Sequence, residues 1–484
     1  MHSAFALLLF TASLSAQRIA IRNVTAIDAD GARPNVNVIV SGGRVMVASA
    51  KAAIPAGAAV IDGRGKYLIP GLWDMHVHLW ETNPMSHLYV ANGVLGVRDM
   101  GSDYARTSKL RSDILTGQIP GPRIYTSGPV IDGPRSGMKQ APVLTADTPE
   151  EARQAVDSID KASGDFVKIL SGLSFDAYQA VAQRSRVIRM PFAGHLPDSV
   201  TMLEAIDARQ KSIEHMFGLA VACSPLEPSL RSQRADAIAK KDRAALVAIR
   251  QRTYDTFSPG AANQLFHRMA RFGVWQTPTL TLWRRMSLID TDRLATASEL
   301  RFVPQSIRAS WADPRKDLEG VTPERLASFR KDYEFHRALV KLLFGSGAGV
   351  LAGTDTGDPY VVPGFALHDE LEALVEAGVS PLDALTSATL GPARFFETES
   401  SFGKIARGKV ADLVLLNANP LTDIRNTRRI SAVILNGSVL DRRCLDQLLE
   451  GKNTGCPSVS LTPKPAPSSA PRRASSRRRV SRTR

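Results

Sequence analysis

The stretch that decides the fold reads Pro70-Gly71-Leu72-Trp73-Asp74-Met75-His76-Val77-His78-Leu79. Its apolar run predicts a β-strand, and two histidines stand one residue apart near the end of that run. Because residues i and i+2 of a strand point to the same face, the imidazoles of His76 and His78 converge on one spot. Two converging imidazoles favour a metal ion.

Length and composition set broad limits. The chain has 484 residues, of which 44% are hydrophobic, so it can bury a large core and exceeds one ordinary domain. The formal net charge is +14, but residues 464–484 carry eight Lys and Arg and no acid. The rest of the chain is therefore only mildly basic, and composition does not indicate a nucleic-acid-binding protein. Three cysteines are too few for a disulfide framework, although Cys444 and Cys456 are candidates for a local pair in an oxidising compartment.

The N-terminus has the pattern of an export signal. A short apolar run is followed by small residues up to Ala16, and only His2 stands in for the usual basic residues before it. This pattern predicts that residues 1–16 are a signal peptide, and hence that the protein is secreted or periplasmic. No other segment approaches the ~20 apolar residues that a membrane helix needs, so we expect no transmembrane segment.

Both ends of the remaining chain are β-like. Short alternating strands are predicted before residue 66, two of them joined by Gly42-Gly43, and again in residues 411–440, where Asn436-Gly437 is a strong hairpin signal. We therefore expect residues 17–66 and 400–445 to build one small β-sandwich domain together. The Ser-, Pro- and Arg-rich residues 457–484 are predicted to be a disordered basic tail.

Residues 67–399 alternate between strand-like and helix-like runs, which is typical of parallel βα units. The predicted strands span residues 73–79, 94–99, 123–127, 166–170, 191–196, 212–216, 275–280 and 350–355. Helices are expected between them, for example over residues 149–163, with Thr148 as N-cap, and over 204–211. The fold class is therefore α/β, a (β/α)8 TIM barrel with a small β-sandwich domain, and the long gaps after residues 218 and 282 are expected to carry extra helices near the mouth.

Candidate ligands lie towards the C-terminal ends of five of the predicted strands, where barrel enzymes place their active sites. They are His76, His78, Lys168, His195, His215 and Asp355. Four imidazoles and a carboxylate suit Zn²⁺ and exceed what one tetrahedral catalytic ion uses, which indicates two divalent ions. Burying a protonated Lys168 without an acid partner is costly. A carbamate formed from its amine and CO₂ would instead be an anionic ligand able to bridge two ions.

With this ligand series in this strand order, the chain resembles the metal-dependent amidohydrolase superfamily, in its binuclear subtype with a carboxylated lysine. It is most similar to the imidazolonepropionase-like and prolidase-like (Xaa-Arg/Lys dipeptidase) branch. The resemblance covers about residues 18–445 and includes residues 69–78, Gly353-Thr354-Asp355 and residues 403–415, Gly-Lys-Ile-Ala-Arg-Gly-Lys-Val-Ala-Asp-Leu-Val-Leu.

The resemblance implies a site and a mechanism. His76, His78 and Asp355 would hold the more buried metal and His195 and His215 the more exposed one, with carboxylated Lys168 bridging both. Two divalent cations lower the pKa of a shared water, so that hydroxide attacks the amide carbonyl near neutral pH. Asp355 is the implied catalytic residue, which accepts the proton of the water and delivers it to the leaving nitrogen.

Substrate is less defined. Many relatives carry Gly-Gly-His after the third strand, whereas residues 128–139 here contain no histidine, so a dipeptidase activity does not follow by analogy alone. We expect a small-molecule amide, either a dipeptide or an N-acyl amino acid. The alternatives are a cyclic amide such as a lactam or imidazolone, and a non-catalytic barrel kept as a binding scaffold, which the complete ligand set disfavours.

Two further acidic residues and four further histidines are expected to have supporting or structural roles. Asp74 and Glu214 are expected to support the ligands, and the remaining histidines of the catalytic domain, His87, His267, His336 and His368, are expected to be structural or surface residues. The tail lacks aromatic residues for stacking on bases, so no specific nucleic-acid partner is expected. An accessory electrostatic role for the tail and a homo-oligomeric state are left open.

Overall fold

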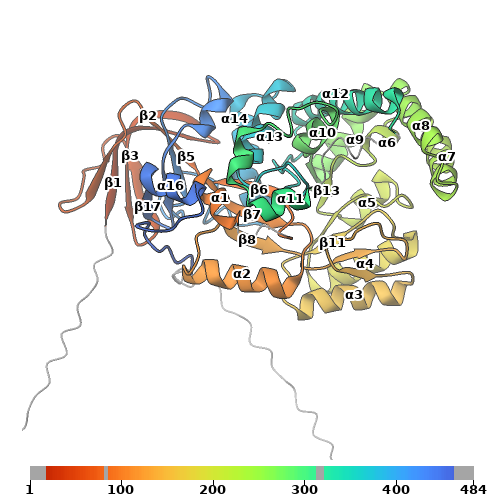
Figure 1. Ribbon diagram of the computed structural model, residues 1–484, viewed down its shortest axis with the longest axis horizontal. Helices are drawn as coiled ribbons and strands as arrows, with labels where there is room; N and C mark the ends of the chain where they lie inside the picture. Colours follow the sequence, from red (N-terminus) through yellow and green to blue (C-terminus); the bar gives the residue numbers. More distant parts are fainter. Residues whose placement is uncertain (1–17, 81–84, 312–320, 463–484) are drawn as a thin grey trace, which may run out of the picture.

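A computed structural model describes residues 18–80, 85–311 and 321–462. The predicted signal peptide, residues 1–16, lies outside the described residues. Two modules lie side by side, with a β-sheet module at one end of the molecule and a larger α/β module beside it (Figure 1). Strands from residues 19–70 and 413–441 form the sheet module, and the residues between them form the α/β module.

The sheet module joins the two ends of the chain. Its strands have the order β17-β16-β15-β5-β1-β2-β3, and β4 pairs with β1. Their bounds are β1 Ile19–Asp28, β2 Gly31–Ser41, β3 Arg44–Ser49, β4 Ala59–Asp62, β5 Tyr67–Pro70, β15 Leu413–Leu416, β16 Ile430–Leu435 and β17 Ser438–Asp441. Both predicted hairpins are present, because Ser41 pairs with Arg44 and Leu435 with Ser438. The sheet reaches Pro70, beyond the predicted end of the first segment at residue 66, since β5 pairs with β15.

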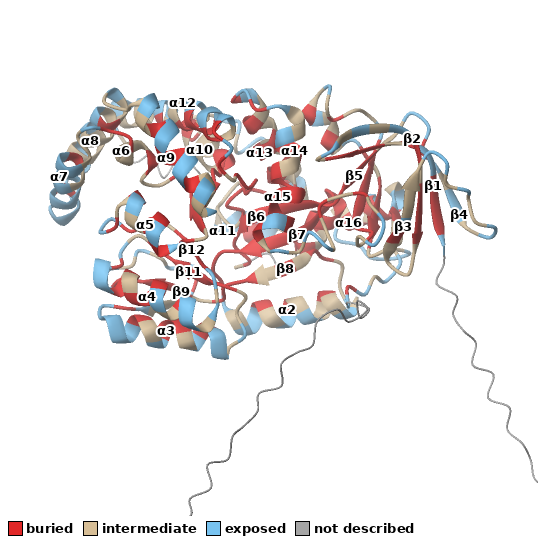
Figure 2. Cartoon of the chain, turned by 180° about the vertical axis from the view of Figure 1, so that it is seen from behind, coloured by how far each residue is buried: buried red, intermediate tan, exposed pale blue. Residues whose placement is uncertain are grey.

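A separate cluster of buried apolar residues lies within this module, contributed by both chain ends. Its members include Ile21, Val38, Leu413 and Ile434, each with an exposed fraction of zero. The sheet therefore encloses its own core, and Figure 2 shows this buried surface running along β1 and β5. Two segments far apart in sequence are held together by apolar burial as well as by strand pairing.

The α/β module contains seven of the eight predicted barrel strands, all parallel to their neighbours. They are β6 Leu72–Val77, β7 Val94–Asp99, β8 Arg123–Thr126, β11 Val167–Ile169, β12 Phe192–Gly194, β13 Ser212–Glu214 and β14 Trp275–Thr277. Two further short strands, β9 Val130–Asp132 and β10 Val143–Thr145, extend one edge. The strands form a sheet of order β6-β7-β8 and a sheet of order β10-β9-β11-β12-β13-β14. The fold is a TIM-barrel arrangement in which the ladders do not form one continuous circle.

The eighth predicted strand takes the form of isolated bridges. Val350 bridges to Gln276 beside β14, and Thr356 bridges to Val77 at the end of β6. Between them, Met75 N–H donates to Ala352 O over 2.9 Å, and Leu351 N–H donates to Gln276 O over 2.9 Å. Residues 350–356 thus link the two sheets by backbone hydrogen bonds and carry Asp355 into the space between them.

Helices pack around these strands (Figure 1). They are α1 Ser86–Ala91, α2 Tyr104–Thr116, α3 Pro149–Lys161, α4 Phe175–Ile188, α5 Met202–Ala208, α13 Phe365–Glu376, α14 Pro381–Ser387, α15 Leu390–Phe395 and α16 Arg442–Leu449, with short 3₁₀ turns at Ser298–Phe302 and Ile424–Arg428. The predicted N-cap of α3 is confirmed: the Thr148 hydroxyl accepts from Glu151 N–H, and the Glu151 carboxylate accepts from Thr148 N–H. This reciprocal cap fixes where the helix begins.

The two long gaps carry extra helices, as predicted. They are α6 Leu219–Ala222, α7 Glu227–Ala239, α8 Arg243–Asp255 and α9 Pro259–Phe272 in the first gap, and α10 Leu280–Ser287, α11 Gln305–Ser310 and α12 Pro323–Gly345 in the second. The pair α7 and α8 projects from the end of the molecule opposite the sheet module (Figure 1). Much of its surface is exposed (Figure 2). None of the described helices combines the length and apolarity that a membrane crossing requires.

The start of the predicted tail is packed. Cys444 and Cys456 form a disulfide, which confirms the local pair. Leu461 is buried and its N–H donates to Leu115 O over 2.9 Å, so residues 457–462 lie against the end of α2. The predicted disorder is therefore wrong for these six residues. The remainder of the basic tail, residues 463–484, lies outside the described residues.

Candidate metal centre

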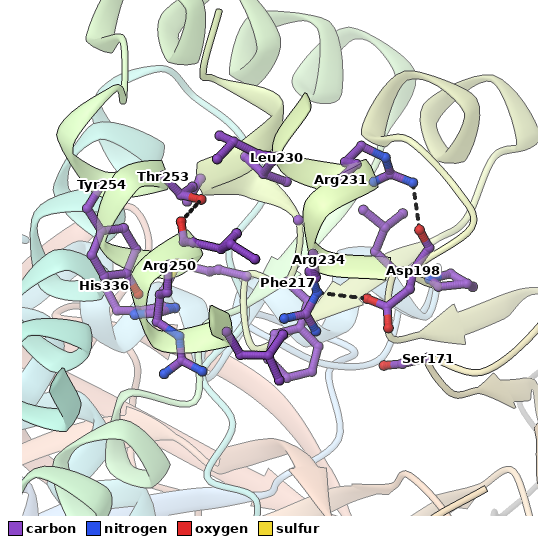
Figure 3. A pocket seen from close by; sticks show the side chains of 18 of the residues that line it. Ser171, Asp198, Phe217, Leu230, Arg231, Arg234, Arg250, Thr253, Tyr254 and His336 are labelled. Carbon is purple, nitrogen blue, oxygen red and sulfur yellow. Dashed lines mark hydrogen bonds and ion pairs between the residues drawn. The ribbon is translucent and has the colours of Figure 1, made fainter. Parts of the chain in front are cut away.

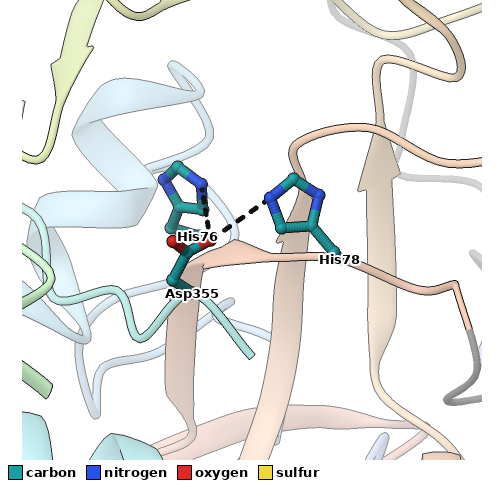
Figure 4. A group of neighbouring side chains, drawn as sticks. All are labelled: His76, His78 and Asp355. Atoms are coloured by element: carbon teal, nitrogen blue, oxygen red, sulfur yellow. Dashed lines mark ion pairs between the residues drawn. The ribbon is translucent and has the colours of Figure 1, made fainter. Parts of the chain in front are cut away.

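His76 and His78 face one carboxylate. Both lie at the end of β6, and their Nε2 atoms are each 3.2 Å from Oδ1 of Asp355 (Figure 4). All three residues are buried, and their ligand atoms lie within 4.8 Å of one another. The two imidazoles therefore converge as predicted, and they do so on a carboxylate from a distant part of the sequence.

Asp355 is held by its own backbone. Its N–H donates to His76 O over 2.8 Å, and its φ of 63° is in the left-handed region that a non-glycine residue rarely adopts. His215 (φ 59°) and Met216 (φ 56°), directly after β13, share this uncommon conformation. Such conformations cluster at functional sites because the surrounding structure must stabilise them. Here they turn Asp355 and His215 towards each other, with Nε2 of His215 3.9 Å from Oδ2 of Asp355.

The second pair of histidines completes the cluster. His195 follows β12 and His215 follows β13, and their ring centroids are 5.2 Å apart. The ring of His215 is also 4.7 Å from that of His76. The structure therefore brings together the four predicted histidine ligands and Asp355.

Each of these histidines uses Nδ1 for a contact directed away from the centre. The partners of Nδ1 are Glu214 Oε2 at 2.8 Å for His76, Gly101 O at 3.1 Å for His78, Ser171 Oγ at 3.0 Å for His195 and Thr279 Oγ1 at 2.7 Å for His215. A hydrogen bond at Nδ1 fixes the ring and leaves Nε2 as the ligand atom, which is the arrangement found around protein-bound metals. Nε2 of His76 is buried and has no hydrogen-bond partner among the described residues. The donor set therefore fits a divalent metal.

Behind His76 lies a fully buried ion pair. Arg98 Nη2 is 2.9 Å from Glu214 Oε2, and both side chains are entirely buried. Arg98 also donates to Met75 O, Ser212 Oγ and Thr277 Oγ1. Burial alone would raise the pKa of Glu214, but Arg98 and His76 outweigh it and hold that pKa well below its usual range. Glu214 therefore stays ionised and orients His76, which confirms that it supports a ligand.

Asp74 has a similar supporting position. Its carboxylate accepts from the Thr354 hydroxyl over 2.7 Å and from Thr354 N–H over 3.1 Å. It also accepts from His76 N–H over 3.3 Å. Asp74 thus ties the backbone of β6 to the residue that precedes Asp355, as the sequence led us to expect of a supporting residue.

Lys168 lies at the centre of β11 with an exposed fraction of 1%. No acid lies within ion-pair distance of its amine among the described residues. Burial lowers the pKa of Lys168 to about 8, although the nearby charges of Glu214 and Asp355 oppose that shift. A buried amine that is readily neutral is chemically suited to react with CO₂, since only the neutral amine is nucleophilic.

The comparisons with known proteins agree with this geometry. Residues 67–440 match the Amidohydrolase family. The chain belongs to that family. It is accordingly a metal-dependent hydrolase of C–N bonds, and the predicted membership of the superfamily is confirmed.

Individual relatives of this amidohydrolase are distant. Ochratoxinase of Aspergillus niger is 22% identical over 416 residues, covering 76% of this chain and 73% of that protein. An adenine deaminase of Clostridium botulinum is 29% identical over 145 residues, and this chain spans only 23% of its length. Among solved structures, a bottromycin amidohydrolase has a TM-score of 0.67 at 22% identity, covering 89% of this chain and 88% of that one. A Xaa-Pro dipeptidase with bound methionine has a TM-score of 0.63 at 21% identity, covering 88% and 100%.

The other histidines of this amidohydrolase lie away from the metal centre. His368 Nδ1 contacts Thr427 Oγ1 at 2.9 Å and its Nε2 contacts Asn92 O at 3.1 Å, so it is a hydrogen-bonded core residue. His87 is half-buried on α1 and His267 is exposed on α9. His336 stacks on Trp283 with ring centroids 3.8 Å apart and borders a cavity beside the centre.

Three important residues escaped the sequence analysis. Arg98 and Thr279 are common residue types in unremarkable positions, and only the strand order places them behind the ligands. Ser171 follows Lys168 by three residues, and its hydroxyl reaches His195 on the next strand. All three residues lie in or shortly after barrel strands. This position in the sequence is the signal that could have identified them.

Proposed function

We propose that this chain is a binuclear metal-dependent hydrolase that cleaves the amide bond of a dipeptide or an N-acyl amino acid. One observation carries the proposal: four buried or half-buried histidines turn Nδ1 outwards, which leaves four Nε2 atoms for metal around Asp355. This set exceeds the needs of one catalytic ion with an open position.

The proposed ligand assignment is the one that the family resemblance implies, and the proximity of His76, His78 and Asp355 supports its first group. His76, His78 and Asp355 would hold one ion, and His195 and His215 the other. Lys168, as a carbamate, would bridge the two. The absence of an acid partner for this buried amine, among the described residues, supports that role, because a carbamate removes the cost of a buried, unpaired cation.

The metal ions would supply a water ligand of lowered pKa and would polarise the amide carbonyl. The protein supplies the proton transfer. Asp355 lies 3.2 Å from His76 Nε2 and 3.9 Å from His215 Nε2, between the two groups of ligands. Burial would raise the pKa of Asp355, but His76 and His215 hold it well below its usual range, so the carboxylate is ionised and ready to accept a proton. It can then deliver that proton to the leaving nitrogen, which amide cleavage requires.

The number of metal ions bound per chain tests the proposal. Elemental analysis of protein grown with zinc and bicarbonate is expected to give two metals per chain, falling sharply in Lys168→Ala and not in Lys161→Ala, which removes an amine at the end of α3. The same preparations are assayed with dipeptides, N-acyl amino acids and lactams. One metal per chain that survives the loss of Lys168 would refute the bridged site, and cleavage of lactams alone would refute the substrate class.

We also propose that the protein is exported. The pattern of residues 1–16 supports this, as does the disulfide between Cys444 and Cys456, because disulfides persist mainly in oxidising compartments. Expression of the full chain in a bacterial host with N-terminal sequencing of the product tests the idea. Recovery from the periplasm with an N-terminus near Gln17 is expected, and an intact N-terminus in the cytosol would contradict export.

A further inference from the structure

A cavity of about 370 Å³ adjoins the metal centre on the side of His195 and His215. Phe217 forms part of its wall, and the ring of Phe217 lies 5.0 Å from the rings of both histidines. Ser171, whose hydroxyl contacts His195 Nδ1, lines it as well. The volume is within the range of small-molecule sites, and the position is at the end of the barrel where substrates bind.

Most of the cavity wall is apolar. Side chains from α7, α8 and α12 face it, among them Leu230, Leu246 and Leu339. Trp283 and Phe217 add aromatic surface, with ring centroids 6.4 Å apart. Such a wall gains free energy by covering a large aliphatic or aromatic group of a ligand.

The polar part of the wall is cationic. Three arginines line the cavity, Arg231 and Arg234 from α7 and Arg250 from α8, whereas Asp198 is the one acid among its described lining residues. Arg250 is paired with the buried carboxylate of Asp332, which also accepts from Tyr254 OH over 2.8 Å. The charge of Arg250 is therefore compensated, and the excess positive charge belongs to Arg231 and Arg234.

Both arginines contact Asp198, but only Arg234 pairs with its carboxylate. Arg234 Nε is 3.2 Å from Asp198 Oδ1, while Arg231 Nη2 donates to the backbone carbonyl of Asp198 over 2.8 Å (Figure 3). A guanidinium has five N–H donors, so each arginine keeps several for another acceptor. In the described part of the chain, no carboxylate lies within ion-pair distance of Arg231, which hydrogen-bonds only to the backbone carbonyl of Asp198. Two guanidinium groups with spare donors match the two oxygens of a ligand carboxylate.

A short chain of contacts connects the arginines to the metal centre. Asp198 N–H donates to Ser171 O over 3.1 Å, and the hydroxyl of Ser171 contacts His195. An anionic group held at Arg231 and Arg234 would therefore be anchored to the same segment that orients His195. This arrangement is independent of the loop at residues 128–139, which lacks the histidine that many relatives carry.

We propose that Arg231 and Arg234 bind the carboxylate of the substrate and that the apolar wall covers its large side chain. This inference rests on the proposed amide hydrolysis and specifies its substrate class: amides that carry a free carboxylate next to an aromatic or large aliphatic group. The arginines determine specificity and take no part in the proton transfer.

The test compares two amides that differ only in the carboxylate, N-benzoyl-L-phenylalanine and N-benzoyl-2-phenylethylamine. The metal-loaded enzyme is expected to prefer the acid in kcat/KM, chiefly through KM. Arg231→Met and Arg234→Met keep an apolar stem and are each expected to lower this preference by about 10- to 100-fold, the range for a hydrogen bond to a charged group. Arg243→Met, an exposed position on α8 outside the cavity, is the matched control and should leave the preference unchanged.

Asp198→Asn should have the opposite effect. It removes the carboxylate that competes for Arg234, so the acid is expected to bind up to about 5-fold more tightly, the worth of an exposed ion pair. A purely structural role of the arginine and aspartate contacts would instead weaken binding in all three variants. Tighter binding of the acid in Asp198→Asn, together with weaker binding in the arginine variants, therefore identifies a carboxylate site.

Binding without cleavage separates this inference from the hydrolase proposal. Isothermal titration of the metal-loaded protein uses two ketones in which CH₂ replaces the amide N–H, 2-benzyl-4-oxo-4-phenylbutanoate and its carboxylate-free counterpart 1,4-diphenylbutan-1-one. Arginine-dependent binding of the acid without cleavage of either amide would refute the hydrolase substrate but not the carboxylate site. Cleavage of both amides with equal efficiency, or equal binding of both ketones, would refute the carboxylate site and leave the hydrolase proposal intact.

Discussion

The hydroxyl of Thr279 lies 2.7 Å from Nδ1 of His215. Thr279 follows β14 with a φ of 49°, an uncommon conformation that turns its side chain back towards the neighbouring strand. The contact fixes the orientation of an imidazole whose Nε2 faces the metal centre. A residue 64 positions away from His215 in the sequence thus fixes the orientation of a candidate ligand.

Replacing Thr279 with valine should weaken metal binding at the proposed site formed by His195 and His215. Valine keeps the branched shape but cannot hydrogen bond to His215, and loss of such an outer contact typically costs 10- to 100-fold in metal affinity. Competition with a zinc chelator measures this, and the more weakly held ion should be affected first. Thr279→Ser keeps the hydroxyl and should restore affinity, whereas equal affinity in the valine and serine variants would show that the contact is unimportant.

Replacing Asp355 with asparagine should abolish most activity. The amide cannot accept the proton of the attacking water, and general-base catalysis of this kind contributes about 10²- to 10⁴-fold. Rates must be expressed per bound metal, because Asp355 is also a proposed ligand. Asp207→Asn, at an exposed ion pair with Arg268, is the control and should retain activity. A rate per metal that is unchanged in Asp355→Asn would assign proton transfer to another group.

The sequence could predict the candidate ligands because each one lies within or directly after a predicted barrel strand. A strand end is a local feature, so the order of β6, β11, β12 and β13 was enough to place His76, Lys168, His195 and His215 at one face. Asp355 was placed correctly although its strand is reduced to isolated bridges. Its left-handed conformation follows from tertiary contacts, which residue pattern does not encode.

The supporting groups and the cavity could not be read from pattern. Arg98 reaches Glu214 across the barrel, and that pairing depends on which strands become neighbours and in which register. The cavity depends on how α7 and α8 pack over the strand ends, whereas the sequence indicated only that extra helices fill residues 218–273. The shape of the cavity therefore depends on packing between segments that are distant in the sequence, namely the loops and helices that follow the strands.

Removing Arg98 should destabilise the fold. Arg98→Met would leave the carboxylate of Glu214 buried without its cation, and breaking one partner of a buried pair costs about 3–5 kcal/mol. The free energy of unfolding from urea titration measures this loss. Arg425→Met, at an exposed ion pair with Asp423, is the control and should change stability little. An equal change in the free energy of unfolding in the two variants would mean that the buried Arg98 pair stabilises the fold no more than an exposed pair does.

Glu370 should make stability depend on pH. Burial raises its pKa from 4.5 to about 7, so the folded protein binds this proton more tightly than the unfolded chain. Stability is therefore lost as the pH rises from about 4.5 to about 7, by up to about 3 kcal/mol. This pH-dependent loss is absent in Glu370→Gln. The free energy of unfolding, measured by urea titration at pH 5 and pH 8, should therefore be higher in the variant than in wild type at pH 8, relative to their difference at pH 5. The exposed change Glu376→Gln on the same helix should follow wild type. If the free energy of unfolding of Glu370→Gln and of wild type depended on pH in the same way, the raised pKa of Glu370 would be refuted.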